Sequence, residues 1–212
     1  MNPNAQPPAW AAWVLASILP SRDRDAVPGD LLEEYRLDRL PALGKVWADL
    51  WFVGQVVRQV WRSTWFAIVP LAATLMLGDF HHALIDPYSP VFPENVFGTV
   101  VLAGFLLVGI VNGRRTGRVA GATLLTTGTW AGAWFLLGLW WAMTLYPFAP
   151  FMRESPYWIQ AWHYKPNDLS FERWLLYDNI GAFVLGGAFG LSISTAAGVA
   201  GGLVGRALRA RA

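Results

Sequence analysis

The sequence contains no cysteine and few charged residues. The absence of cysteine excludes disulfides, thiolate metal sites and cysteine nucleophiles from its 212 residues. Charged side chains make up 14% of the chain, whereas soluble domains carry about a quarter. The net charge of +2 is too small to indicate nucleic acid as a partner. Instead, the chain is 55% hydrophobic and has 13 tryptophans and 21 glycines, a composition typical of a protein in a lipid bilayer.

Four apolar stretches are long enough, or nearly long enough, to cross a bilayer as helices, which takes about 20 residues. The first is short and contains Pro70, which predicts a kink. We expect it to gain length from the helical turns before it. The composition and these stretches predict an all-α integral membrane protein with a transmembrane domain over residues 64–204. Its four transmembrane helices cover about 64–79, 96–112, 119–146 and 180–204.

Basic residues are unevenly distributed around these spans. Seven precede the first span, three lie in the loop "NGRRTGR" between the second and third, and three lie in the tail 205–212, so 13 of 16 fall on one side. The positive-inside rule then places both termini in the cytoplasm. The first 20 residues have no basic n-region, so we expect no signal peptide. The pattern predicts a multi-pass protein of the bacterial cytoplasmic (inner) membrane.

Residues 1–43 predict a cytoplasmic helical prefix ahead of the spans. A helix over residues 9–19 and a second helix starting in "PGDLLEEYR" form a hairpin closed by a turn. Asp30 has the spacing of an N-cap with Glu33 three residues on, as in a capping box. Such a hairpin is too small for a core of its own and must pack against other parts of the protein, the membrane or a partner. The prefix motif comprises Gly29, Asp30, Leu31, Glu33, Glu34, Tyr35 and Arg36.

Residues 44–63 predict an amphipathic interfacial helix that leads into the first span. Gln55, Arg58, Gln59 and Arg62 recur at helical spacing and form one narrow polar stripe. If the helix lies in the membrane interface, its tryptophans sit at headgroup depth and its arginines point to water. Alternatively, the helix packs on its neighbours and the stripe is merely solvated. The predicted interfacial anchors are Trp47, Trp51, Trp61, Arg58 and Arg62.

The first third of the chain resembles a known module. The segment "PPAWAAWVLASILPSRDRDAVPGDLLEEYR", followed by "VWADLWFVGQVVRQVWRS", is similar to the permease prefix module found before the membrane part of macrolide-exporter-like ABC permeases and on some smaller membrane proteins. This resemblance covers about residues 7–65 and implies a cytoplasmic helical adaptor at a membrane surface. It lends no catalytic residue. Nothing after residue 65 resembles such a permease, so the transporter function does not carry over.

The fourth predicted span carries small residues every four positions. Such a stripe lets another helix approach closely. The third span is the favoured partner, through Gly117, Gly121, Gly128 and Gly132, and another subunit is the alternative. The predicted helix-packing interface comprises Ala182, Gly186, Gly190, Ser194, Gly198 and Gly202.

Candidate sites for chemistry are few. His81, His82 and Asp86 are metal-ligand types, with His163 on the other outer loop, but adjacent histidines on a helix point about 100° apart. Polar residues at a helix end are the favoured interpretation, and no metal is predicted. The Trp-rich outer loop, with Trp158, Trp162, Tyr164 and Trp174, reads as an aromatic belt rather than as a binding surface. No cofactor is predicted, and a bound lipid or pigment is neither indicated nor excluded.

These patterns predict a non-catalytic accessory or structural subunit of a larger membrane complex for transport or energy transduction. Its expected partners are the lipid bilayer, other membrane subunits and a cytoplasmic protein at the prefix. No ionisable residue lies within a span core, where pumps usually need one. Two alternatives remain: a small transporter or channel using the threonines of the third span, and a metal-dependent enzyme at the outer membrane surface.

Overall fold

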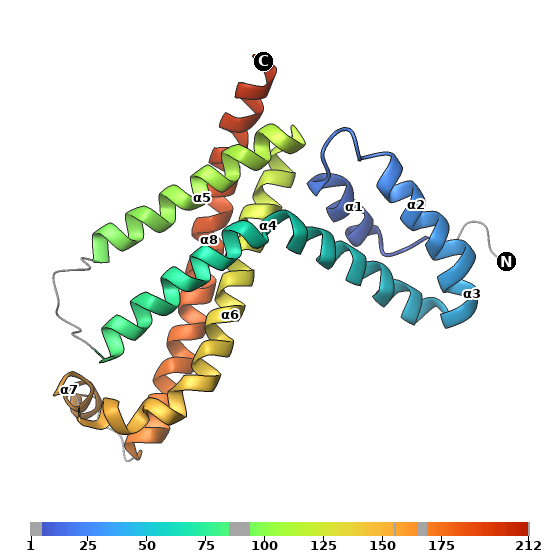
Figure 1. The fold of residues 1–212 in the computed structure, drawn as a ribbon. Coiled ribbons are helices and arrows are strands. Elements are labelled where there is room, and N and C mark those ends of the chain that lie inside the picture. Colours follow the sequence, from blue (N-terminus) through green and yellow to red (C-terminus); the bar gives the residue numbers. More distant parts are fainter. Residues whose placement is uncertain (1–5, 85–93, 155, 165–168, 212) are drawn as a thin grey trace. The chain divides into compact units, whose positions relative to one another are not determined.

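A computed structural model describes residues 6–84, 94–154, 156–164 and 169–211. Within these ranges the chain is helical and has no strand (Figure 1), so the predicted all-α fold class is confirmed. The elements are, in order, α1 (Ala9–Ile18), α2 (Ala26–Glu34), the π-turn η1 (Tyr35–Arg39), α3 (Leu40–Leu43), α4 (Lys45–Leu84), α5 (Glu94–Thr116), α6 (Val119–Glu154), α7 (Pro156–Tyr164) and α8 (Phe171–Ala210).

Within the described residues, three helical segments are long and apolar enough to cross a membrane: Lys45–Gly78, Gly98–Thr116 and Phe171–Ala210. The predicted interfacial helix and first span belong to one continuous helix, α4. Helix α6 spans 36 residues but is not among the three. Its threonines, glycines and tryptophans lower its mean hydropathy, because hydropathy scales count tryptophan as mildly polar although it favours membrane interfaces.

The chain divides into two compact units. The first unit comprises Met1–Phe66, Ala103–Gly128 and Ser194–Ala212, and the second comprises Ala67–Leu102 and Thr129–Ile193. Helices α4, α5, α6 and α8 each contribute residues to both units.

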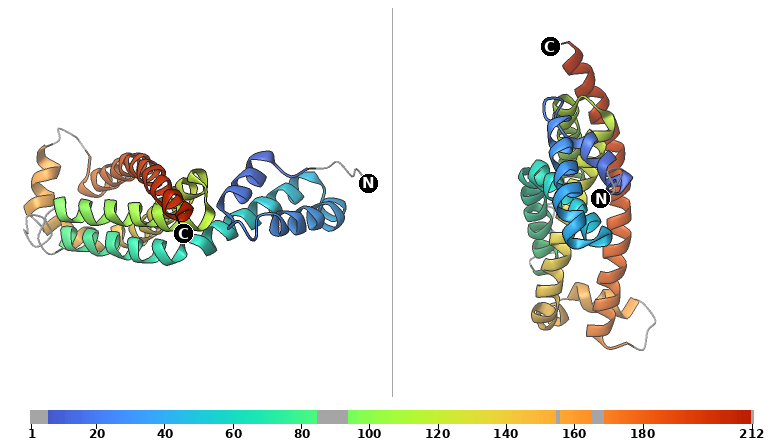
Figure 2. Two further views of the ribbon diagram at one scale, coloured as in Figure 1. Left: turned by 90° about the horizontal axis from the view of Figure 1, so that it is seen from above. Right: turned by 90° about the vertical axis from the view of Figure 1, so that its right-hand side faces the viewer.

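The core of the first unit forms where α1 and the π-turn pack on the first half of α4. Ala11 and Leu15 of α1 meet Tyr35 and, from α4, Phe52 and Val56, all at most 3% exposed. Apolar residues four apart lie on one helix face, so α1 and α4 each offer a stripe to this core. Both views of Figure 2 show α1 and α2 running beside this part of α4.

Helix α2 begins earlier than its capping signal predicted. Asp25 is its N-cap residue and the helix starts at Ala26, so Asp30 lies inside the helix and the predicted capping box of Asp30 and Glu33 is wrong. Pro28 was expected to precede the helix. It occupies the third helical position instead, where an N–H group would have no intrahelical partner, so proline loses no hydrogen bond there.

Two glycines of the first unit have a positive φ and lie between helices. Gly44 (φ 75°) ends α3 before α4, and Gly117 (φ 69°) lies between α5 and α6. Residues with a Cβ rarely adopt this left-handed conformation. Each glycine therefore allows a sharp change of direction between two helices.

The second unit has an aromatic core around the start of α8. Phe171, Trp174 and Leu175 of α8 are buried with Ala149 of α6, and residues of α7, including Trp158, pack against them. Helix α8 begins nine residues before the predicted span because Ser170 caps it: its hydroxyl accepts a hydrogen bond from the Arg173 N–H (3.4 Å). At its other end α8 continues to Ala210, so the predicted basic tail is mostly helical.

Candidate functional site

The prefix is held on α4 through Tyr35. This side chain is fully buried, and its hydroxyl donates a 2.6 Å hydrogen bond to Asp49 Oδ1. Lys45 pairs with the same carboxylate at 3.0 Å. The Tyr35 ring meets Phe52 edge-on, with centroids 6.1 Å apart. Because the π-turn starts at Tyr35, the local change in helical winding coincides with the residue that locks the prefix in place.

The other residues of the prefix motif lie around this contact between Tyr35 and Asp49. Glu34 forms an ion pair with Arg39 at 2.6 Å. The Arg39 guanidinium also lies over the Trp51 ring, 5.1 Å from its centroid. Leu31 packs against the buried core, whereas Gly29, Asp30 and Glu33 are exposed and Arg36 is half-buried. The motif thus has one side in the core and one side open.

A polar groove of about 260 Å³ opens between the prefix and α4. All four residues of the predicted polar stripe of α4 line this groove, with the two glutamines half-buried and the two arginines exposed. Opposite them lie Leu15 of α1 and three residues of α2. The complete lining is Leu15, Val27, Asp30, Leu31, Gln55, Arg58, Gln59 and Arg62.

The tryptophans predicted as anchors differ in their exposure. Trp47 is 65% exposed and Trp61 is 44% exposed, whereas Trp51 is half-buried beside Phe52 and under Arg39. Leu50 and Val57 are exposed as well. Their spacing from Trp47 and Trp61 places these apolar side chains on one face of α4.

Hydrogen bonds from three arginines connect the prefix to other helices of the first unit. One arginine belongs to the prefix, and the other two donate to it. Arg24 Nη2 donates to the Thr116 carbonyl at the end of α5 (2.8 Å). Arg118 Nη1 donates to the Ala16 carbonyl (3.3 Å), and Arg209 Nη2 donates to the Ser21 hydroxyl (2.9 Å). Cationic side chains at helix C-termini also interact favourably with the helix dipole, as Arg24 does at α5.

The small-residue stripe of α8 packs within the chain. In the second unit, a side chain at Gly186 or Gly190 would collide with the indoles of Trp134 and Trp130, respectively. In the first unit, Gly198 lies against Thr123 of α6, and Gly202 lies against α6 and α5. Ser194 is fully buried, whereas Ala182 is exposed.

The glycines expected to receive this stripe face elsewhere. Gly121 lies against the Ser17 carbonyl, Gly128 against Val60, and Gly132 against Ile68, while Gly117 lies against the Arg209 guanidinium. The predicted glycine-to-glycine contact of α6 with α8 is therefore wrong. Gly121, Gly128 and Gly132 of α6 bring α4 and the prefix close, while the tryptophans, threonines and Gly138 of α6 meet α8.

A second glycine contact joins α5 to α8 in the first unit. This contact was not predicted from the sequence. A Cβ at Gly113 would lie 2.8 Å from the Gly202 carbonyl oxygen, and one at Gly201 would lie 2.6 Å from the Leu106 carbonyl oxygen. The signal was present as two further pairs of glycines four residues apart, namely Gly109 with Gly113 and Gly201 with Gly205.

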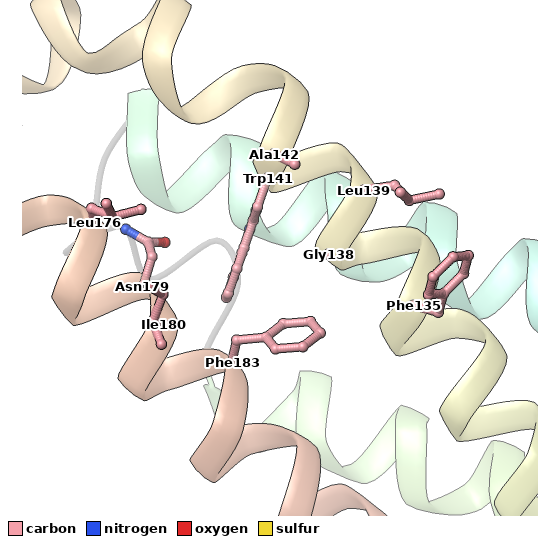
Figure 3. Close-up of a pocket in the computed structure, with 9 residues that line it drawn as sticks. All are labelled: Phe135, Gly138, Leu139, Trp141, Ala142, Leu176, Asn179, Ile180 and Phe183. Atoms are coloured by element: carbon pink, nitrogen blue, oxygen red, sulfur yellow. The ribbon is translucent and has the colours of Figure 1, made fainter.

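The second unit holds an apolar pocket of about 540 Å³ between α6 and α8 (Figure 3). Trp141, Gly138 and Phe135 line it from α6, and Phe183 and Asn179 line it from α8. The Asn179 amide nitrogen donates to the Leu175 carbonyl (2.8 Å), so its oxygen is the polar atom turned toward Trp141 (Figure 3). Deeper in the unit, Trp134 Nε1 donates to the Phe183 carbonyl at 3.0 Å.

The described part of the chain gathers none of the residues considered for metal binding or transport into a site. His81, His82 and Asp86 lie outside the residues whose side chains are described, and the described part of the chain holds no cluster of metal-ligating residues. His163 Nδ1 lies 2.7 Å from the Ile159 carbonyl of its own helix. Thr123 and Thr126 likewise donate to the backbone of α6, while Thr127 meets Thr195 of α8 at 3.1 Å.

Comparisons with protein-family models, curated proteins and solved structures give no match to this chain.

Proposed function

We propose that this protein is a non-catalytic, multi-pass subunit of the bacterial cytoplasmic membrane that serves a larger membrane complex through its N-terminal prefix. The four spans of this proposal are the second half of α4, α5, α6 and α8. Three of them lie in segments that are long and apolar enough to cross a bilayer, and α6, with 36 residues, also exceeds the required length.

Outward-facing apolar side chains support membrane insertion. Leu107 of α5, Phe135 of α6 and Leu185 and Phe189 of α8 are 62–72% exposed. Exposed apolar surface that extends over several helices marks contact with lipid or with other membrane proteins. The bias of 13 among 16 basic residues supports cytoplasmic termini and a cytoplasmic prefix.

The observation that carries the adaptor role is the way the prefix is attached. Tyr35 and Arg24 fix it in one position through buried or partly buried hydrogen bonds. One side of the prefix motif, with Gly29 and Glu33, nevertheless remains exposed. A rigidly mounted, exposed surface suits docking, because little conformational entropy is lost when it binds a partner.

Native mass spectrometry of the full chain, extracted from its own membranes in mild detergent, tests this proposal. We expect a larger assembly of fixed stoichiometry. A photo-crosslinking residue at the exposed position Glu33 should capture the same partner, while one at the exposed Arg211 should not. A chain that arrives alone or as a homo-oligomer overturns the subunit role.

A further inference from the structure

The groove between the prefix and α4 contains charged groups that have no partner in the described part of the chain. Arg62 and Asp30 both line the groove, yet neither side chain forms an ion pair or hydrogen bond with another described residue. The only such contact of the Arg58 side chain is a 3.4 Å hydrogen bond to Gln55 Oε1. Two cations and one anion thus share a space of about 260 Å³ without neutralising one another.

The polar lining indicates the chemistry that this groove would accept. Guanidinium groups present N–H donors in a planar fork that matches phosphate oxygens. A carboxylate such as Asp30 only accepts hydrogen bonds, and the two glutamine amides both donate and accept. A ligand that satisfies all of them carries a phosphate at one end and a hydrogen-bond donor at the other.

The position of the groove indicates where such a ligand comes from. Val57 and Trp61 directly precede Arg58 and Arg62 in α4, and each successive helical residue turns by about 100°. The groove therefore borders the apolar face of α4, where Val57 is 61% exposed and Trp61 is 44% exposed. An interfacial helix arranged in this way keeps apolar side chains among acyl chains and basic ones at the level of the headgroups.

We infer that the groove binds the headgroup of a membrane glycerophospholipid. Arg58 and Arg62 hold the phosphodiester, Asp30 accepts a hydrogen bond from the hydroxyl or amine at the end of the headgroup, and the acyl chains lie along the face of Trp61. This inference deepens the proposed function and rests on its claim that the chain is a membrane protein.

The test uses the purified full chain in phosphatidylcholine nanodiscs doped with phosphatidylglycerol or phosphatidylethanolamine. Native mass spectrometry then counts the lipids retained on the released protein. Phosphatidylcholine is the matched control, because it has the same phosphodiester but no donor at the end of its headgroup. We expect phosphatidylglycerol and phosphatidylethanolamine to be retained about tenfold more strongly than phosphatidylcholine.

Variants assign the effect to the groove. R58Q/R62Q should lower retention of both doped lipids about tenfold, whereas R114Q/R115Q, which removes two exposed arginines from the end of α5, should change it less than twofold. D30A, which removes the acceptor, should abolish the preference over phosphatidylcholine. Equal losses in the two double variants, or retention without preference, overturn the headgroup site.

Inorganic phosphate provides the last arm of the test. Phosphate added to the nanodiscs should not displace the lipid at millimolar concentration, and displacement through Arg58 and Arg62 would make a free anion the ligand and overturn the lipid assignment. Successful reconstitution without lipid preference overturns only this inference. A chain that fails to enter nanodiscs overturns both this inference and the proposed membrane function.

Discussion

The hydroxyl of Tyr35 lies 2.6 Å from Asp49 Oδ1, and this hydrogen bond joins the π-turn after α2 to the second turn of α4. Tyr35 is fully buried, and Asp49 is also paired with Lys45 at 3.0 Å. A buried hydroxyl bonded to a carboxylate is a directional contact, whereas the surrounding apolar packing is not. This pair therefore sets which face of the prefix meets α4.

Replacing Tyr35 with phenylalanine should destabilise the prefix by about 1–3 kcal/mol, because the ring stays packed but Asp49 loses its buried donor. The free energy of opening of residues 6–43 can be measured by native-state proteolysis in detergent. Y177F is the matched control, since Tyr177 is 62% exposed and its loss should cost less than about 0.5 kcal/mol. Equal resistance of Y35F and Y177F to the protease would contradict the anchoring role.

Alkaline pH should loosen the same contact. Burial raises the pKa of Tyr35 above its ordinary value of 10.0, and the nearby Asp49 raises that pKa further by accepting the hydrogen bond and by repelling a phenolate, while Lys45 opposes the shift. The folded prefix therefore prefers the protonated phenol. Its contribution to stability is fully present below pH 10 and is lost as the pH rises through the raised pKa.

The pH effect can be isolated by comparing the wild type with Y35F. Phenolate absorbance of the wild type minus that of Y35F gives the titration of Tyr35, which should lie above pH 10. Denaturant unfolding at pH 9 and pH 11 should show a larger loss of stability in the wild type than in Y35F. The hydrogen bond to Asp49 raises the pKa of Lys45 above its ordinary value and is available in both proteins, so an equal loss in both would assign the effect to deprotonation of Lys45 instead.

Residue patterns that repeat along one helix predicted much of this structure. Apolar length identified α4, α5 and α8, and the spacing of Gln55, Arg58, Gln59 and Arg62 correctly predicted a single stripe on a helix. The prefix, the four spans and the cytoplasmic termini stay predictions. The capping signal at Asp30 failed because the helix already begins at Ala26, after Asp25, whose side chain forms no cap hydrogen bond.

The stripe of α8 lies against α6, the span favoured as its partner, but the sequence could not supply which residues of α6 it meets. Glycine spacing shows that a face is flat, but a flat face accepts glycine, threonine or an indole equally well. Gly190 therefore meets Trp130 rather than a glycine of α6. The groove could not be predicted from the sequence either. It combines Asp30 with residues of α4 about 25 positions away, and no local sequence pattern indicates that these residues lie together.

The contact of α8 with α5 should tolerate no added methyl group. A Cβ at Gly201 would lie 2.6 Å from the Leu106 carbonyl oxygen and 2.9 Å from Gly109 Cα, both backbone atoms. Gly201→Ala should therefore destabilise the protein by about 1–3 kcal/mol. Gly104→Ala is the control, since α5 leaves open space there and alanine favours a helix by up to about 1 kcal/mol. Thermal unfolding in detergent should separate the two variants, and a G201A midpoint at or above that of G104A would refute close packing at this site.

Arg24 should be the residue whose loss detaches the prefix from α5. Its Nη2 donates a 2.8 Å hydrogen bond to the Thr116 carbonyl, at a helix end where a positive charge is favourable. Its Nε is buried and has no hydrogen-bond partner among the described residues, so the charge has already lost part of its hydration. Arg24→Gln should cost about 1–3 kcal/mol in the docking of the prefix, because the charge-assisted bond to the last carbonyl of α5 is lost.

Hydrogen exchange over residues 9–34 measures that docking directly. R24Q should exchange faster there, while the Tyr35 contact keeps the rest of the prefix on α4. Arg22→Gln is the matched control, because the Arg22 side chain is 85% exposed and its one ion pair among the described residues is with the adjacent Asp23 at 3.4 Å. An exposed pair of this kind contributes about 0–1 kcal/mol, so R22Q should leave the exchange rates almost unchanged. If R22Q and R24Q exchange alike, Arg118 and Arg209 hold the prefix without Arg24.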